Sequence, residues 1–202
     1  MKRLLCYITL MGLTTSLSAQ TVSSAEKDSK LHELEDVISL NSTQKNSIHK
    51  ALSNRREQRT GLSHEKRTKK WDKKDMAFKK YEIDKKYHEE LIRSLSKKQI
   101  AEYCNIVFAP EVDAKTNYKL SLLTEESNYS EAEISAMYQD IYKYLMLEKI
   151  VYFTYKYDYA KQKNNISRLK AIQPSVLKAS NNIEKQKGYG KFISGKIQWN
   201  GK

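Results

Sequence analysis

Glycine and proline are scarce in this sequence, whose 202 residues include six glycines and two prolines. Most of the glycines lie near the two ends of the chain. Sheets need frequent turns, and turns depend on residues that adopt positive φ or fix φ near the turn value. Long stretches without such breakers favour long helices instead. We therefore predict an all-α fold, arranged as a bundle of long helices or as cradle-like helical hairpins.

Cysteine is equally scarce, because the chain contains only Cys6 and Cys104. Cys6 lies in the predicted export signal described below, so Cys104 would be alone after cleavage and could form no internal disulfide. Its sequence neighbours include Ile100, Tyr103 and Val107. We expect Cys104 to be a buried small hydrophobic residue. The alternative is an intermolecular disulfide.

The residue types that build catalytic and metal centres are dispersed along the chain. No two histidines stand four residues apart and none is near a cysteine, whereas metal sites need clustered ligands. No glycine-rich phosphate loop links a strand to a helix. We predict no catalytic residue, no metal ligand and no cofactor, and therefore a non-enzymatic protein. The histidines are His32, His49, His64 and His88.

The first twenty residues have the three-part build of an export signal. Two basic residues precede an apolar run over residues 4–13, and small or polar residues follow. That run is too short to cross a bilayer, which takes roughly 20 residues. We predict a signal peptide over residues 1–19, cleaved after Ala19 or alternatively after Ser18. The protein would then be periplasmic, without stable membrane insertion.

Positive charge dominates the chain, with a formal net charge of +13 and a pI of about 9.5. Loss of Lys2 and Arg3 with the signal leaves +11. Such a surface favours acidic partners, namely anionic lipid head groups, cell-wall polymers or unfolded acidic proteins. Only seven of the 37 basic residues are arginine, the residue suited to bidentate recognition of phosphates and bases. We therefore expect no nucleic-acid partner.

Hydrophobic periodicity predicts a series of helices. The expected helices cover residues 25–39, a segment that starts at 42 and dissolves within 54–61, then 63–94, 97–108, 111–123, 131–163 and 166–187. The last of them is interrupted at Pro174. We expect a flexible leader over residues 20–30 and a flexible tail over residues 188–202.

Two of these predicted helices carry distinctive side chains. In helix 63–94, apolar residues recur at three- and four-residue steps or their sums, so we expect an apolar face. Helix 131–163 holds seven of the chain's 14 tyrosines, whose rings supply buried area while their hydroxyls stay wet. The residues of the expected apolar face are Trp71, Phe78, Tyr81, His88 or Leu91, and Leu95.

One pattern recurs at three predicted helix starts: an apolar residue, a capping residue, two variable positions, and then Gln or Glu. In such a capping box the cap accepts a hydrogen bond from the first turn, and the Gln or Glu side chain bonds back to the N–H of the cap. Each box contributes about 1 kcal/mol by fixing where a helix begins. The copies are Leu40-Asn41-Ser42-Thr43-Gln44, Leu95-Ser96-Lys97-Lys98-Gln99 and Tyr129-Ser130-Glu131-Ala132-Glu133.

The first two boxes flank a long charged segment in a basic chain with an export signal, and this combination resembles the Spy/CpxP-like, LTXXQ-motif periplasmic proteins. The resemblance covers residues 31–109, and residues 110–187 add a C-terminal helical extension. Asn41 stands where the family usually has Thr or Ser. The resemblance implies an all-helical, cradle-shaped homodimer that binds unfolded proteins or signalling partners without ATP during envelope stress.

Residues 55–80 contain eleven Lys or Arg residues against four acidic ones, with aromatic side chains interleaved. One interpretation is a solvated helix face whose aromatic residues belong to the core. The other is a client-binding surface, on which positive charge attracts unfolded acidic segments and aromatic rings take up apolar side chains. The predicted contact residues are Arg55, Arg56, Arg59, Lys66, Lys69, Trp71, Lys73, Phe78 and Lys80.

These features lead to a preferred function and a competing one. We expect an exported envelope-stress protein that acts as an ATP-independent chaperone, or holdase, on unfolded or partly folded envelope proteins. The competing hypothesis is a non-catalytic adaptor or structural protein. In that case the Tyr-rich helix 131–163 would pack against a dedicated partner or a second copy, and the basic surface would rest on an anionic envelope polymer.

Overall fold

The computed structural model describes residues 31–68, 71–125 and 127–187. The predicted signal peptide, leader and tail therefore lie outside the described residues, as does Lys69. Within the described ranges every regular element is a helix and no strand occurs, which confirms the all-α prediction. No helix in these ranges is both long and apolar enough to span a membrane.

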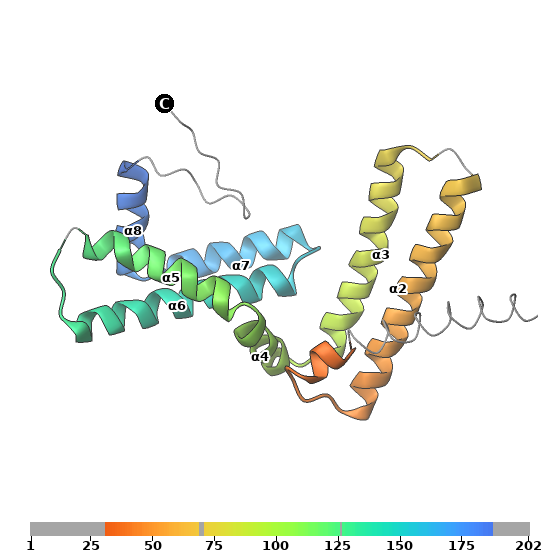
Figure 1. Ribbon diagram of the computed structural model, residues 1–202, viewed down its shortest axis with the longest axis horizontal. Helices are drawn as coiled ribbons and strands as arrows, with labels where there is room; N and C mark the ends of the chain where they lie inside the picture. The colour runs from red at the N-terminus through yellow and green to blue at the C-terminus, as the bar shows by residue number, and fades with distance from the viewer. Residues whose placement is uncertain (1–30, 69–70, 126, 188–202) are drawn as a thin grey trace, which may run out of the picture. The chain divides into compact units, whose positions relative to one another are not determined.

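The chain divides into two compact units, Met1–Tyr103 and Cys104–Lys202. In unit 1 residues 31–35 are helical, and α2 and α3 then lie side by side as a helical hairpin (Figure 1). The helix that follows this hairpin crosses the boundary between the units. The bounds are Ser42–Thr68 for α2, Lys73–Ser94 for α3 and Lys97–Val107 for α4.

The core of unit 1 comes from apolar side chains at helical spacing. On α2 the buried residues Ile48, Ala51 and Leu52 occupy adjacent turns, and Leu62 continues the same helix. Residues at three- and four-residue steps share one face of a helix, which here packs against α3. Burial of each aliphatic side chain contributes about 1.5–3 kcal/mol. The other buried apolar residues are Leu34, Ile38, Met76, Leu91, Leu95 and Ile100.

Two helix boundaries predicted for this region are wrong. Helix α2 does not dissolve within residues 54–61 but continues through Gly61 to Thr68. Glycine costs about 1 kcal/mol inside a helix relative to alanine, and burial of Leu62 next to it outweighs that cost. The single helix expected over 63–94 is instead the end of α2, a short connection, and α3. Asp72 has an extended backbone and precedes the first residue of α3.

Unit 2 contains the remaining helices, in which α5 packs against α6 and α8, and α6 also packs against α7 and α8. The helices expected over residues 97–108 and 111–123 are present with boundaries shifted by one or two residues. Pro110 lies in the first turn of α5, where its missing N–H costs no helical hydrogen bond. The bounds are Ala109–Thr124 for α5, Glu131–Thr154 for α6, Tyr159–Ala171 for α7 and Ser175–Gln186 for α8.

The single helix expected over residues 131–163 is also wrong, because α6 ends at Thr154 and α7 begins at Tyr159. The chain leaves the helical conformation at Tyr155, where φ is −108° and ψ is 30°. Asp158 then caps α7, since its carboxylate accepts a hydrogen bond of 3.0 Å from the N–H of Lys161. The break predicted at Pro174 is confirmed, because α7 ends before it and α8 begins after it.

Cys104 is fully buried, as expected from its neighbours in the sequence. Burial raises the pKa of its thiol to about 12. The thiolate is the reactive form of cysteine, so this side chain is chemically inert in the folded protein. The prediction of a buried small hydrophobic residue is therefore confirmed for Cys104.

Candidate protein-binding surface

The start of α2 is fixed by the first predicted capping box. The N–H of Gln44 donates to Oδ1 of Asn41 at 2.9 Å, and the N–H of Asn41 donates to Oε1 of Gln44 at 3.1 Å. The second box caps α4 in the same way, with distances of 3.2 Å from the N–H of Gln99 to Oγ of Ser96 and 2.9 Å in return. Both glutamines therefore satisfy N–H groups that the helix itself leaves open.

The two boxes are also joined to each other through their glutamine side chains. Nε2 of Gln44 donates to Oε1 of Gln99 at 2.8 Å, and Nε2 of Gln99 donates to Oε1 of Gln44 at 3.1 Å. The same amide nitrogens reach the backbone carbonyls of Ser94 at 2.9 Å and Ser39 at 2.7 Å. This neutral network ties together the start of α2, the end of α3 and the start of α4.

The third predicted box caps α6 in unit 2. The N–H of Glu133 donates to Oγ of Ser130 at 3.3 Å, and the N–H of Ser130 donates to Oε2 of Glu133 at 2.8 Å. The N–H of Ser130, and then its hydroxyl, which also donates to Oε2 of Glu133 at 2.8 Å, lower the pKa of the Glu133 carboxyl. The preceding Tyr129 is half-buried, as is Ile134 one turn into the helix. The box therefore fixes where α6 begins.

Two of the predicted contact arginines are engaged inside the hairpin. Nε of Arg55 lies 2.8 Å from Oδ1 of Asp84, and a terminal nitrogen of Arg59 lies 2.5 Å from Oδ2 of the same carboxylate. Partial burial works to raise the pKa of Asp84, but the hydrogen bonds from both arginines outweigh it and lower the pKa. The guanidinium of Arg55 also lies 5.1 Å from the centre of the Tyr87 ring. Arg55 and Arg59 thus link α2 to α3.

Trp71 lies in the connection between α2 and α3 and is half-buried. Nζ of Lys79 lies 3.7 Å from the centre of the Trp71 ring, a cation–π contact. The same nitrogen is 3.7 Å from Oε2 of Glu65 on α2. Trp71 and Lys79 therefore help to close the end of the hairpin.

Phe78 and Tyr81 do not belong to the core face of α3, which corrects the apolar face expected there. Their exposed fractions are 64% and 45%, whereas Met76, His88 and Leu91 are buried. The cause is the helical register, since each residue turns the helix by roughly 100° and Phe78 therefore points about 200° away from Met76. Phe78 and Tyr81 form an exposed aromatic pair on α3.

The hairpin also exposes lysine side chains. Lys73 and Lys80 on α3 are exposed, and Lys66 is exposed on α2. Arg56 is half-buried on α2. The predicted contact residues therefore separate into two groups. Arg55, Arg59 and Trp71 contact other residues of the hairpin. The second group faces solvent and consists of Lys66, Lys73, Phe78 and Lys80.

A shallow hollow of about 380 Å³ lies between α2 and α3. The apolar side chains of Leu62 and Ile83 line it, together with charged side chains. No heavy atom lies within 4 Å of the position that a Cβ would occupy at Gly61. The absent side chain at Gly61 leaves the hollow open at this point. The charged residues are Glu65, Lys79 and Glu82.

Comparison with known protein families, with curated proteins and with solved structures yields no match. Within residues 31–68, 71–125 and 127–187, no three His, Cys, Asp or Glu side chains are grouped so that they could hold a metal ion. Function is therefore inferred from the chain's own surfaces.

Proposed function

We propose that this protein is an exported, ATP-independent holdase that binds unfolded or partly folded envelope proteins through the α2–α3 hairpin. The observation that carries the proposal is the exposed aromatic pair, Phe78 and Tyr81, on a hairpin that also exposes several lysines. An aromatic ring of this kind offers roughly 150–250 Å² of surface to a partner. Unfolded chains expose the apolar side chains that such rings take up.

The positive charge of the hairpin supplies attraction at longer range. Lys66, Lys73 and Lys80 would draw acidic segments of a client toward the aromatic pair, which raises the rate of encounter at low salt. Arg55 and Arg59 contribute differently, because their pairing with Asp84 holds the two helices in register. We assign them a positioning role in place of direct contact with the client.

Export is part of the same proposal. It rests on the sequence of the first twenty residues, where two basic residues precede an apolar run and small residues follow. It also agrees with the resemblance of the first two capping boxes to those of the Spy/CpxP-like periplasmic proteins. A homodimer follows from this resemblance, and sedimentation velocity of the purified protein tests it.

The aromatic pair is tested by the double substitution Phe78→Ala and Tyr81→Ala. We expect the double variant to lose most of its ability to keep a denatured client from aggregating, while its far-UV circular dichroism stays unchanged. The matched control is Tyr159→Ala with Ile172→Ala, because these apolar side chains are at least as exposed but lie in unit 2. Equal activity of both double variants would remove the hairpin from the proposal.

A second candidate function is supported by exposed apolar side chains in unit 2. On the Tyr-rich helix α6, Leu147 and Tyr152 are exposed, and Ile172 is exposed after α7. A non-catalytic adaptor would use such a surface for a dedicated partner, with the basic hairpin resting on an anionic envelope polymer. Affinity capture from envelope extracts distinguishes the two functions, since a holdase retains a broad mixture and an adaptor retains one stoichiometric partner.

A further inference from the structure

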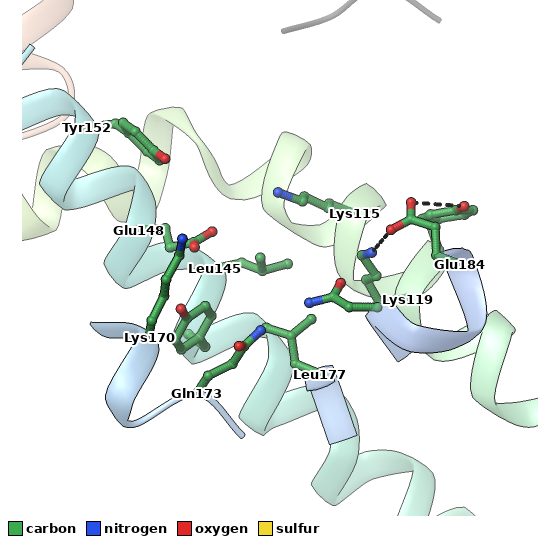
Figure 2. Close-up of a pocket in the computed structure, with 12 residues that line it drawn as sticks. Lys115, Lys119, Leu145, Glu148, Tyr152, Lys170, Gln173, Leu177 and Glu184 are labelled. Atoms are coloured by element: carbon green, nitrogen blue, oxygen red, sulfur yellow. Dashed lines mark hydrogen bonds and ion pairs between the residues drawn. The ribbon is translucent and has the colours of Figure 1, made fainter. Parts of the chain in front are cut away.

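Unit 2 encloses a hollow of about 610 Å³ that the proposed holdase function does not use. Figure 2 shows its walls, which come from α5, α6, α7 and α8 and from the turn between α7 and α8. The volume falls within the roughly 300–1,000 Å³ of pockets that bind small molecules. Charged side chains of both signs line it, namely Lys115, Lys119, Glu148, Lys170 and Glu184.

One lysine of the hollow is committed to an ion pair. Lys119 is only 5% exposed, and its Nζ lies 2.5 Å from Oε2 of Glu184. The hydroxyl of Tyr118 donates to the other oxygen of this carboxylate at 3.3 Å (Figure 2). The Lys119–Glu184 pair is therefore neutral as a unit and links α5 to α8 as part of the wall.

The other two lysines are open to a ligand. Among the residues that the structure describes, none forms an ion pair within 4.0 Å of Lys115 or Lys170. Both lysines line the hollow together with Glu148 (Figure 2), whose carboxyl pKa is raised by burial while the charges of Lys115 and Lys170 work to lower it. Two ammonium groups from different helices, α5 and α7, thus border the same hollow.

Apolar and aromatic side chains also line the hollow. Leu145 and Leu177 are buried there, as is the ring of Tyr144, whose hydroxyl works to lower the pKa of the Glu148 carboxyl. The ring of Tyr152 is half-exposed and also lines the hollow. A cationic side and an apolar, aromatic wall within one cavity suit an amphipathic anion.

We propose that this hollow binds a small organic carboxylate with an apolar body. Lys115 and Lys170 hold the carboxylate, and the apolar body packs against Leu145 and Leu177. A singly charged headgroup fits this site, because the Glu148 carboxylate offsets one of the two lysine charges and leaves a net charge of +1 for the ligand to balance. This site is independent of the α2–α3 hairpin.

The test uses isothermal titration calorimetry of the purified protein with three probes that share one apolar body. These are 3-phenylpropionate, 3-phenylpropanol and 3-phenylpropylammonium, and phenyl phosphate tests the headgroup. We expect saturable 1:1 binding of 3-phenylpropionate, at least about tenfold tighter than of the alcohol, since a hydrogen bond to a charged group is worth roughly that factor. The ammonium probe is expected not to bind.

The matched variants assign the binding to the two lysines. Lys115→Met with Lys170→Met should weaken the binding of 3-phenylpropionate by at least about tenfold, because methionine keeps the aliphatic stem and removes the charge. Lys178→Met is the control, since Lys178 is exposed on α8 and does not line the hollow. Circular dichroism confirms that each variant is folded.

Several results would overturn the proposal. Absence of binding of 3-phenylpropionate, equal binding of the alcohol, or unchanged affinity of the Lys115/Lys170 variant would each contradict the site. Tighter binding of phenyl phosphate would contradict the choice of a carboxylate. Failure of the holdase proposal would be visible separately, as client aggregation that the Phe78/Tyr81 variant does not change, whereas failure of this site shows only in probe binding.

Discussion

The side-chain amides of Gln44 and Gln99 donate hydrogen bonds to each other, at 2.8 Å and 3.1 Å, across 55 residues of sequence. Each glutamine at the same time completes the capping box of its own helix. Each glutamine side chain thus caps its own helix and also links two helix starts that are far apart in the sequence. The repeated motif marks a joint between helices as well as their beginnings.

Gln44→Ala tests this joint. The substitution removes the partner of the Gln99 amide and the bond to the Ser94 carbonyl, so we expect a loss of about 2 kcal/mol in the free energy of unfolding. Urea denaturation followed by Trp71 fluorescence, with Trp199→Phe in the background, reports on unit 1. Gln58→Ala is the control, since Gln58 is exposed on α2.

The coupling between the two glutamines is measured by a double-mutant cycle. Gln99→Ala should cost a similar amount, and the double variant should cost less than the sum of the single ones by about 1 kcal/mol. Additive losses would show that the two capping boxes act independently, which contradicts the proposed joint.

Asp84→Asn should weaken the link between α2 and α3 by about 0.5–1 kcal/mol at neutral pH. The hydrogen bonds of Arg55 and Arg59 lower the pKa of Asp84 in the fold despite its partial burial. The folded protein therefore gains stability above the ordinary carboxyl pKa, roughly 4, and loses it as the pH falls through the folded value.

The check is the urea midpoint of wild type and Asp84→Asn between pH 7 and pH 3, with Asp75→Asn as the control because Asp75 is exposed on α3. We expect the difference between wild type and Asp84→Asn to shrink toward acid pH. A difference that stays constant over this range would show that the arginine pairs add no pH-dependent stability.

Lys119→Met should destabilise unit 2 by about 3 kcal/mol, because it leaves the Glu184 carboxylate partly buried without its ammonium partner. The double variant Lys119→Met with Glu184→Gln should recover part of the loss, since it removes both charges. Hydrogen exchange measured by mass spectrometry on peptides of α5 and α8 follows the effect. Equal losses in the single and double variants would mean that the pair itself is unimportant.

Cys104 should not react with a thiol reagent in the folded protein, because it is fully buried and burial raises its pKa to about 12. With Cys6 replaced by Ser, 5,5′-dithiobis(2-nitrobenzoate) should label no thiol under native conditions and one thiol in concentrated urea. Rapid native labelling, or a disulfide-linked dimer on a non-reducing gel, would revive the alternative of intermolecular pairing.

The sequence predicts local features of this fold well, and the three helix starts are the best example. A cap and a Gln or Glu three residues later make a local hydrogen-bond pattern, so the pattern locates the start of a helix without knowledge of the rest of the chain. Pro174 is similarly local, because proline interrupts a helix wherever it occurs in the interior. The all-α class follows from the same scarcity of breakers.

The missed features depend on tertiary contacts or on weaker signals. The ends of α2 and α6 carry neither Gly nor Pro, and their following helices begin after Asp72 and Asp158, which resemble ordinary charged residues of a longer helix. The Lys119–Glu184 pair joins residues 65 positions apart, and no periodicity predicts such a partner. Asp158 could have indicated the start of α7, because aspartate is a favoured N-cap residue.

The exposure of the aromatic pair could not be decided from spacing alone. Three- and four-residue steps relate Phe78 and Tyr81 to each other and to Leu91, but they do not indicate which face α2 will cover. Packing against α2 selects the face with Met76 and leaves Phe78 in solvent. Phe78, which the sequence offered both as a core residue and as a contact residue, therefore stays a candidate contact, and Tyr81 joins it.

The most direct measurement is suppression of aggregation of a chemically denatured acidic protein by the purified chain without ATP, at low and at high salt. The proposed function predicts suppression near equimolar ratio at low salt and weaker suppression at high salt, because screening removes the attraction by the lysines. Absence of suppression at severalfold excess, with the helical circular dichroism intact, would contradict the holdase function.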